Sequence, residues 1–222
     1  MGLWRKIVKD ADDLNSEREL QIMKIMSWNI QNGGAINHLK EQEKNPLKNP
    51  IPSNITNILD IINEETPDVL VLQEFEYQYW SQLIENGLKR QGFRNFVYYS
   101  DYLEGHTAAN GVLICSRGEK PNERERPSDI WKYTFRNWCE IDISDIGLRL
   151  LAVDVPLPEK LNGATNCERE DILKIDGELY DCSQRKDFLK ALKKKFFEYS
   201  SLQTPAIILG DFNLYITEDG RK

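Results

Sequence analysis

In "DVLVLQE", residues 68–74, four apolar residues follow one another before the run ends in Gln73 and Glu74. A strand with one face in water alternates apolar and polar residues, whereas a strand covered on both faces is apolar throughout. Residues 53–67 come directly before it, with apolar residues at helical spacing and a proline at the end. The stretch therefore predicts a strand inside a layered structure, entered directly from a helix.

Other apolar runs predict the partners of this strand. Runs rich in β-branched and aromatic residues occur at residues 22–28, 95–100, 111–116, 137–143, 148–155 and 206–211. Helical spacing predicts helices over 77–91 and 183–200, and the lysines of the second helix are expected to form a solvated face. The charged segment 158–182 has weak periodicity and is expected to be a surface loop with a short irregular element.

The composition is that of a globular domain. Of the 222 residues, 40% are hydrophobic and 29% are charged, which is far from disordered, collagen-like or membrane classes. The net charge of −7 has the wrong sign for a protein that coats nucleic acid through bulk electrostatics. Any contact with nucleic acid is therefore expected to be local, and the oligomeric state stays open.

The sequence carries no signal for export or membrane insertion. No stretch approaches the roughly 20 apolar residues of a membrane span, and the first residues lack the apolar core of a signal peptide. The four cysteines form no CxxC pair and no histidine lies at zinc-like spacing, so reduced thiols are expected rather than a zinc site. A cytoplasmic protein is predicted.

The chain is expected to consist of an extension and one domain. Residues 1–22 are predicted to be an N-terminal helical extension, because apolar residues at positions 3, 4, 7, 8, 11 and 14 share one helical face. Such a face docks on the protein's own surface more often than on a membrane. Apolar runs then recur without a linker, so residues 23–222 are predicted to form the domain.

Three of the predicted strands end in polar side chains. Asn29 ends one, Glu74 another, and Asp211 with Asn213 a third. If these strands are neighbours in a sheet, their ends bring the four residues around one cleft. Oxygen ligands without His or Cys suit Mg²⁺ or Mn²⁺ better than zinc or copper. The set predicts phosphate chemistry, in which Asp211 orients or deprotonates a water and Asn213 donates to an oxygen.

Each of these residues also has a purely structural interpretation. Asn29 and Asn213 tolerate left-handed turns, Glu74 suits the first turn of a following helix, and Asp211 after a glycine suits an Asx-turn. Singly, these interpretations are as good as the functional one or better. The predicted site is excluded only if all four structural interpretations hold at once.

Four motifs, in order "MSWNI", "PDVLVLQE", "NGVLICSR" and "ILGDFN", resemble those of the endonuclease/exonuclease/phosphatase superfamily, the Mg²⁺-dependent phosphoesterases related to deoxyribonuclease I and exonuclease III. The resemblance implies an α+β fold, a four-layer αββα sandwich of two mixed sheets with outer helices. It also implies a phosphate-ester substrate, with nucleic acid possible. By position, it implies that Glu74 binds the metal with Asn29 beside it, that Asp211 positions the water, and that Asn213 contacts the phosphate.

Two features depart from the family pattern. After the predicted hairpin the family places a His or Tyr that holds the phosphate, whereas this chain has Asp154 or Pro156. The family's last strand carries an Asp-His pair, but His38 and His106 both come early, so the C-terminal strands are expected to be missing from this chain. Whether the gene extends past Lys222 stays open. The alternative prediction is a non-catalytic or truncated family member that acts as a binding module.

Overall fold

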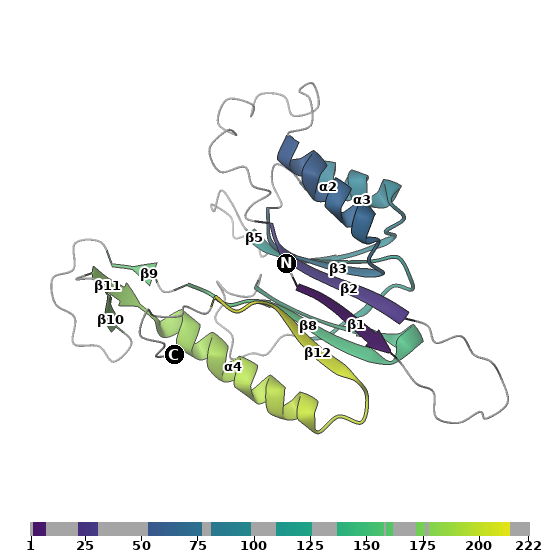
Figure 1. Cartoon of the computed structure of the whole chain (residues 1–222). Coiled ribbons are helices and arrows are strands. Elements are labelled where there is room, and N and C mark those ends of the chain that lie inside the picture. Colours follow the sequence, from purple (N-terminus) through teal and green to yellow (C-terminus); the bar gives the residue numbers. More distant parts are fainter. Residues whose placement is uncertain are drawn as a thin grey trace.

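The helices and sheets of the computed structural model form four layers. The structure describes residues 2–7, 22–30, 53–76, 81–98, 110–125, 137–157, 159–161, 172–175 and 178–213. Helices α2 (Ser53–Glu65) and α3 (Ser81–Arg90) form one outer layer and α4 (Ser183–Ser200) the other, with two mixed sheets between them (Figure 1). The predicted αββα sandwich is confirmed.

The first sheet surrounds the strand that contains "VLVLQE". Its order is β1 (Gly2–Ile7), β2 (Ile22–Asn29), β3 (Val69–Glu76), β5 (Asn110–Ser116) and β4 (Asn95–Tyr98). Only β2 and β3 pair in parallel among these neighbours. A parallel pair needs a crossover, which α2 supplies, so β2 and β3 end on the same side of the sheet.

The second sheet brings the "AIILGD" strand beside the predicted hairpin. Its order is β12 (Ala206–Asp211), β8 (Leu148–Asp154), β7 (Trp138–Ile143) and β6 (Asn122–Glu123). β12 and β8 are parallel, and the other pairs are antiparallel. A short 3₁₀ turn (Ser144–Ile146) closes the hairpin at Gly147, whose φ of 58° is left-handed. β8 and β12 therefore also end on one side.

Side chains along β3 alternate between two apolar clusters. Val69 and Val71 lie between the two sheets, whereas Leu70 and Leu72 pack under α2 and α3. All four residues are 1% exposed or less. The uninterrupted apolar run is explained by this double cover, since each face of the strand has its own apolar neighbours.

α4 covers the outer face of the second sheet. Phe188 and Leu192 of this helix lie in one buried cluster with Trp138 and Val153 of the sheet. The rings of Trp138 and Phe188 meet edge-on, with 5.5 Å between their centroids. The middle of α4 is therefore held by apolar packing.

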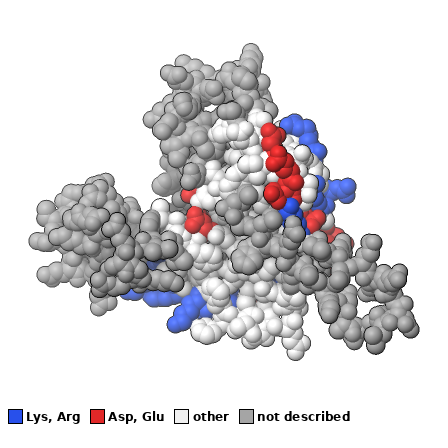
Figure 2. All heavy atoms as spheres, viewed as in Figure 1, with Lys and Arg blue, Asp and Glu red and all other residues white. Residues whose placement is uncertain are grey.

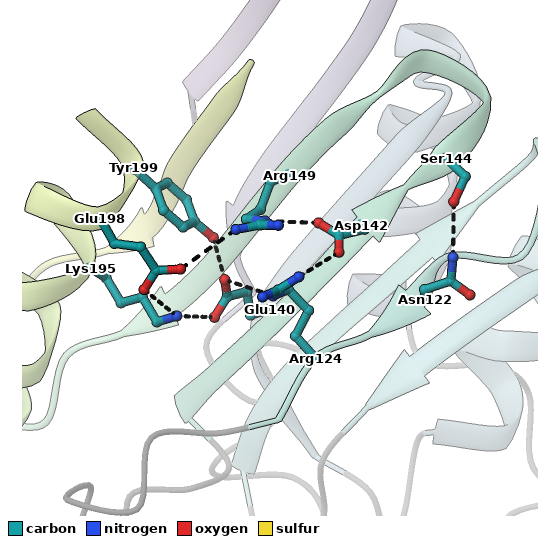
Figure 3. Close-up of polar contacts among 9 residues, drawn as sticks. All are labelled: Asn122, Arg124, Glu140, Asp142, Ser144, Arg149, Lys195, Glu198 and Tyr199. Atoms are coloured by element: carbon teal, nitrogen blue, oxygen red, sulfur yellow. Dashed lines mark hydrogen bonds and ion pairs between the residues drawn. The ribbon is translucent and has the colours of Figure 1, made fainter. Parts of the chain in front are cut away.

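Charged side chains hold the C-terminal half of α4 (Figure 3). The Glu140 carboxylate of β7 is 1% exposed, accepts a hydrogen bond from the Tyr199 hydroxyl at 2.9 Å and pairs with Lys195 at 3.0 Å and Arg124 at 3.4 Å. Burial and the nearby Glu140 carboxylate raise the pKa of Tyr199. Because Lys195 pairs with the buried Glu140, the expectation that the lysines of this helix form a solvated face is wrong for Lys195. Figure 2 shows other Lys and Arg side chains at the lower left of the molecule, in the region where Figure 1 draws α4.

Two predictions of local structure are wrong. Residues 2–7 form β1 instead of a helix, because the edge of β2 offers backbone groups that a strand can pair with; residues 8–21 lie outside the described residues. The segment 158–182 contains a small antiparallel sheet instead of an irregular loop. Its strands are β9 (Glu159–Lys160), β10 (Ile172–Ile175) and β11 (Glu178–Asp181). Backbone pairing of adjacent segments forms such a sheet without an apolar stripe.

The cysteines follow the prediction where they are described. Cys115, Cys139 and Cys182 are not in disulfides, and Cys167 lies outside the described residues. Burial, with the Glu85 carboxylate as a second cause, raises the pKa of Cys115 and keeps it a protonated thiol. No helix in the described part of the chain is both long and apolar enough to cross a membrane.

Candidate functional site

Polar residues at the ends of strands from both sheets meet at one point. The Asn29 side-chain amide Nδ2 donates to Glu74 Oε1 at 2.9 Å and to Asp211 Oδ2 at 2.7 Å. Glu74 lies on β3 next to β2, as expected, but β12 belongs to the other sheet. The condition of one shared sheet is therefore not met for Asp211, and the site spans the junction of the two sheets.

Glu74 reaches this junction through a bulge in β3. The register between β3 and β5 shifts between Leu72 and Phe75, and Glu74 has a left-handed φ of 53°. The strand continues to Glu76 and the next helix begins at Ser81, so the alternative that Glu74 opens a helix is wrong. The bulge replaces simple alternation by a conformation that turns Glu74 toward Asn29.

The end of β3 is also tied to the end of β2. Ile30 N–H donates to the Gln73 carbonyl at 3.1 Å, and the Gln73 side chain, 1% exposed, donates to Ser27 Oγ at 2.9 Å. Asn29 lies between Ser27 and Ile30 and pairs with Gln73 in the register. These bonds fix Asn29 relative to the bulge.

Gly210 allows β12 to lie close to β8 just before Asp211. Its φ is 139°, and a Cβ at this position would lie 1.8 Å from the Val153 carbonyl oxygen. No other residue type fits without moving one strand. Glycine at this position therefore brings the "GD" end of β12 into contact with the end of β8.

Asp211 and Asn213 form the turn that leaves β12. Asn213 N–H donates to Asp211 Oδ1 at 2.8 Å, and Asn213 has a left-handed φ of 46°. The Asx-turn and the left-handed Asn considered as structural alternatives are thus both present, together with the contact between Asp211 and Asn29. Asp211 therefore stabilises the turn and also supplies a carboxylate to the site.

The end of β8 completes the cluster. Asp154, 8% exposed, pairs with Asp211 in the register of β8 and β12. Asn213 Nδ2 donates to Asp154 Oδ1 at 3.3 Å and to the Val155 carbonyl at 2.7 Å. From the sequence, Asp154 was placed only as one of two candidates for the family's His or Tyr position, because the pairing of β8 with β12 is not visible in a single sequence.

A second residue that sequence analysis missed is Arg185 of α4. Its guanidinium donates to the carbonyls of Pro156 and Asn213, each at 3.0 Å, and to that of Phe212 at 3.5 Å. The acceptors are backbone oxygens, which every residue has. No sequence pattern therefore marks Arg185 as their partner.

Strained backbone concentrates at this site. Within the described ranges, three non-glycine residues have a positive φ, namely Thr66, Glu74 and Asn213, and two of them belong to the cluster. Such conformations cost on the order of 1–3 kcal/mol each and persist where surrounding contacts determine them. The clustering is typical of a functional site.

The donor set fits a hard divalent cation that takes few of its ligands from the protein. Two carboxylates, Glu74 and Asp211, converge on the Asn29 amide from opposite sheets. Mg²⁺ is commonly held by one or two carboxylates, with waters and substrate phosphate as its other ligands. Among the described residues, no three His, Cys, Asp or Glu side chains form a metal-binding group. His38 and His106 lie outside the described residues.

Comparison with known proteins shows which family the chain matches. Residues 26–222 match the model of the Endonuclease/Exonuclease/phosphatase family. No curated protein matches the chain by sequence.

Solved structures share the fold. An AP endonuclease from Archaeoglobus fulgidus is similar with a TM-score of 0.51 and 19% identity, over 75% of this chain and 55% of that one. A 3'-5' exonuclease (NExo) from Neisseria Meningitidis has a TM-score of 0.48 and 21% identity over 88% and 60% of the two chains. TDP2 from C. elegans has a TM-score of 0.48 and 15% identity over 86% and 48%. The chain thus spans between 48% and 60% of the lengths of these three solved structures.

Proposed function

The chain belongs to the endonuclease/exonuclease/phosphatase family, and on this premise we propose that it is a phosphoesterase that hydrolyses phosphodiesters with the help of Mg²⁺ or Mn²⁺. One observation carries the proposal: Glu74 of the first sheet and Asp211 of the second both accept a hydrogen bond from the Asn29 amide. Two carboxylates held this close, near the ends of strands from the two sheets, suit a site that binds a cation and a phosphate.

Glu74 is the proposed metal ligand, with Asn29 beside it. When bound, the ion supplies positive charge that neutralises a phosphate ester and the charge that develops during its cleavage. Glu74 contributes a carboxylate on a bulge whose backbone fixes its direction. Asn29 keeps the Glu74 and Asp211 carboxylates at a defined separation, because one amide nitrogen donates to both.

Asp211 is the proposed base that orients or deprotonates the attacking water. Its Oδ1 is held by Asn213 N–H and its Oδ2 by Asn29, so the plane of the carboxylate is fixed. A carboxylate oxygen accepts more than one hydrogen bond, which leaves capacity for a water. Fixing the base before substrate arrives removes an orientational cost from the reaction.

Asn213 is the proposed donor to the phosphate. Its Nδ2 donates to Val155 O and Asp154 Oδ1, and the Asp154 bond is the longer at 3.3 Å. A phosphate oxygen would replace Asp154 as the acceptor. The Val155 bond, 2.7 Å long, then keeps the amide in place.

The second candidate function is a binding module without catalysis. Asp154 is a buried carboxylate beside Asn213, at the end of β8 where the family resemblance places His or Tyr. A carboxylate repels phosphate unless a cation lies between them. This feature favours a member that retains the sandwich and the metal ligands but turns over slowly or not at all.

The proposal also covers the natural substrate, the cellular location and the extent of the domain. Nucleic acid is one candidate, bound through local contacts, since the net charge is −7. A cytoplasmic location and a domain over residues 23–222, with β1 added to its first sheet, complete the proposal.

Hydrolysis of bis(p-nitrophenyl) phosphate with and without Mg²⁺ tests the proposal. We expect Mg²⁺-dependent release of nitrophenol that falls by about 10²-fold or more in Glu74→Ala and in Asp211→Ala. Asp60→Ala is the matched control, because it removes an exposed carboxylate on α2. Divalent-ion binding without hydrolysis would favour the binding module. The absence of both binding and hydrolysis would contradict the proposed enzyme.

A further inference from the structure

Arg185 links the two chain segments that leave the second sheet at the site. Nη1 donates to the Pro156 carbonyl at 3.0 Å, and Nη2 donates to the Asn213 carbonyl at 3.0 Å and to that of Phe212 at 3.5 Å. Pro156 follows β8, whereas Phe212 and Asn213 follow β12. One guanidinium thus bonds to both segments, and hydrogen bonds from a charged donor are roughly twice as strong as neutral ones.

These contacts lie beyond the last bond of the parallel ladder. The ladder of β8 and β12 extends to the bond from Val155 N–H to the Asp211 carbonyl, 2.8 Å long. Past that bond, the Asn213 side chain and Arg185 connect the segments. Arg185 therefore acts where backbone pairing no longer holds the turn.

The helix that carries Arg185 is itself fixed at several points. Ser183 N–H donates to Asp181 Oδ1 at 2.8 Å at its start, and Phe188 packs edge-on against Trp138 one turn later. Tyr199 is bonded to the buried Glu140 near its end. Arg185 therefore extends from a rigid support, and its donors have a defined position relative to the second sheet.

We propose that Arg185 is a positioning residue that holds the Asp211–Asn213 turn in its active conformation. The inference rests on the proposed phosphoesterase function of the same site. Asn213 has a left-handed φ of 46°, a conformation that persists where surrounding contacts determine it. The bond to the Asn213 carbonyl supplies one of them. Arg185 thereby directs the Asn213 amide and, through Asn213 N–H, the Asp211 carboxylate.

A direct contact between Arg185 and phosphate predicts different kinetics. A residue that binds substrate equally in the ground and transition states changes KM, whereas a residue that orients the reacting groups changes kcat. Both Nη atoms of Arg185 already donate to backbone carbonyls. Positioning is therefore the role that the observed bonds support.

Steady-state kinetics of Arg185→Ala and Arg185→Lys test the proposal with bis(p-nitrophenyl) phosphate at saturating Mg²⁺. A displacement of about 1 Å in an active site costs up to ~10²-fold in rate, so we expect kcat of Arg185→Ala to fall between about tenfold and 10²-fold. KM should stay within about twofold. Arg185→Lys should recover part of kcat, since one ammonium group reaches fewer carbonyls than the planar fork.

Tyr199→Phe is the matched control, because it loosens the same helix at the end away from the turn. It should lower the Tm and leave kcat unchanged. An unchanged kcat in Arg185→Ala, a rise in KM alone, or an equal loss of kcat in Tyr199→Phe would overturn the positioning role.

Hydrogen exchange without metal or substrate separates this inference from the proposed function. Arg185→Ala should speed exchange of the Asn213 amide by at least about tenfold, while the amide of Leu150, in the middle of β8 and paired with Ile141 of β7, keeps its protection. Unchanged exchange at Asn213 overturns the inference even if the wild-type chain is an active enzyme. A wild-type chain without hydrolysis refutes the proposed function, and exchange still decides whether Arg185 holds the turn.

Discussion

Glu74 has a conformation that its side chain does not favour. A left-handed φ of 53° costs a non-glycine residue, and glycine is the residue that usually occupies it. The gain from Glu74 is the direction of its carboxylate, which meets the Asn29 amide at 2.9 Å. A residue selected for stability alone would be glycine at this point in the bulge.

Replacing Glu74 separates strain from function. Glu74→Gly and Glu74→Ala both remove the carboxylate, so both should lose Mg²⁺-dependent hydrolysis. Glu74→Gly should be more stable than Glu74→Ala by about 1 kcal/mol, because only glycine relaxes at this φ. Denaturant unfolding of the two variants measures the difference, and equal stabilities would mean that position 74 is not strained.

Gly210 tests how closely β12 approaches β8. Gly210→Ala places a methyl group 1.8 Å from the Val153 carbonyl oxygen, so one strand must move; we expect a loss of about 3 kcal/mol or more, at the upper end of overpacking costs. Gly147→Ala is the control, since its φ of 58° is left-handed but no atom lies within 4 Å of the added group. It should lose only about 1 kcal/mol. Similar losses by urea unfolding would contradict the close approach.

Single residues also show the limit of sequence analysis. Asn29, Glu74, Asp211 and Asn213 were predictable because they end apolar runs, and the structure brings all four together. Arg185 was not, because its partners are backbone carbonyls of two segments far from it in sequence.

At the scale of elements, long apolar runs were predictable and local pairing was not. The extents of α4 and β12 agree with prediction because their apolar spacing is strong. β1 and the small sheet of β9, β10 and β11 form through backbone hydrogen bonds, which leave little trace in side-chain pattern. Tertiary pairing thus decides such elements.

The network between β7, β8 and α4 predicts a response to acid (Figure 3). Burial alone would raise the pKa of Asp142, but hydrogen bonds from Arg149 and Arg124 hold it below its ordinary value. A carboxylate with a lowered folded-state pKa adds stability above its unfolded pKa of about 3.9 and loses it as pH falls through the folded value.

Asp142→Asn should therefore be less stable than the wild type at neutral pH. The difference should shrink as pH falls below about 4, because protonation removes the same charge from the wild type. Midpoints of urea unfolding between pH 7 and pH 3 measure it. Asp60→Asn, an exposed change on α2, serves as the control. A difference that stays constant down to pH 3 would contradict the role of the Asp142 charge.

At the scale of the whole molecule, the site exists only because two sheets face each other. Asn29 and Glu74 belong to the first sheet and Asp211 to the second. The apolar cluster between the sheets, which includes Val71 and Leu209, sets their separation. The sandwich was expected from the family resemblance, and the site was expected on the condition that the strands are neighbours in one sheet. The sandwich places the three residues at the junction instead.

Binding of Mn²⁺ measured by isothermal titration calorimetry tests the central claim most directly, with the wild type compared with Glu74→Gln, Asp211→Asn and Asp60→Asn. Replacing the ligand Glu74 should weaken binding by about tenfold or more, the low end of what loss of a metal-site group costs. Asp211→Asn should bind more weakly than the wild type by a smaller factor, and Asp60→Asn should match the wild type. Wild-type affinity in Glu74→Gln would contradict a metal site at the junction of the two sheets.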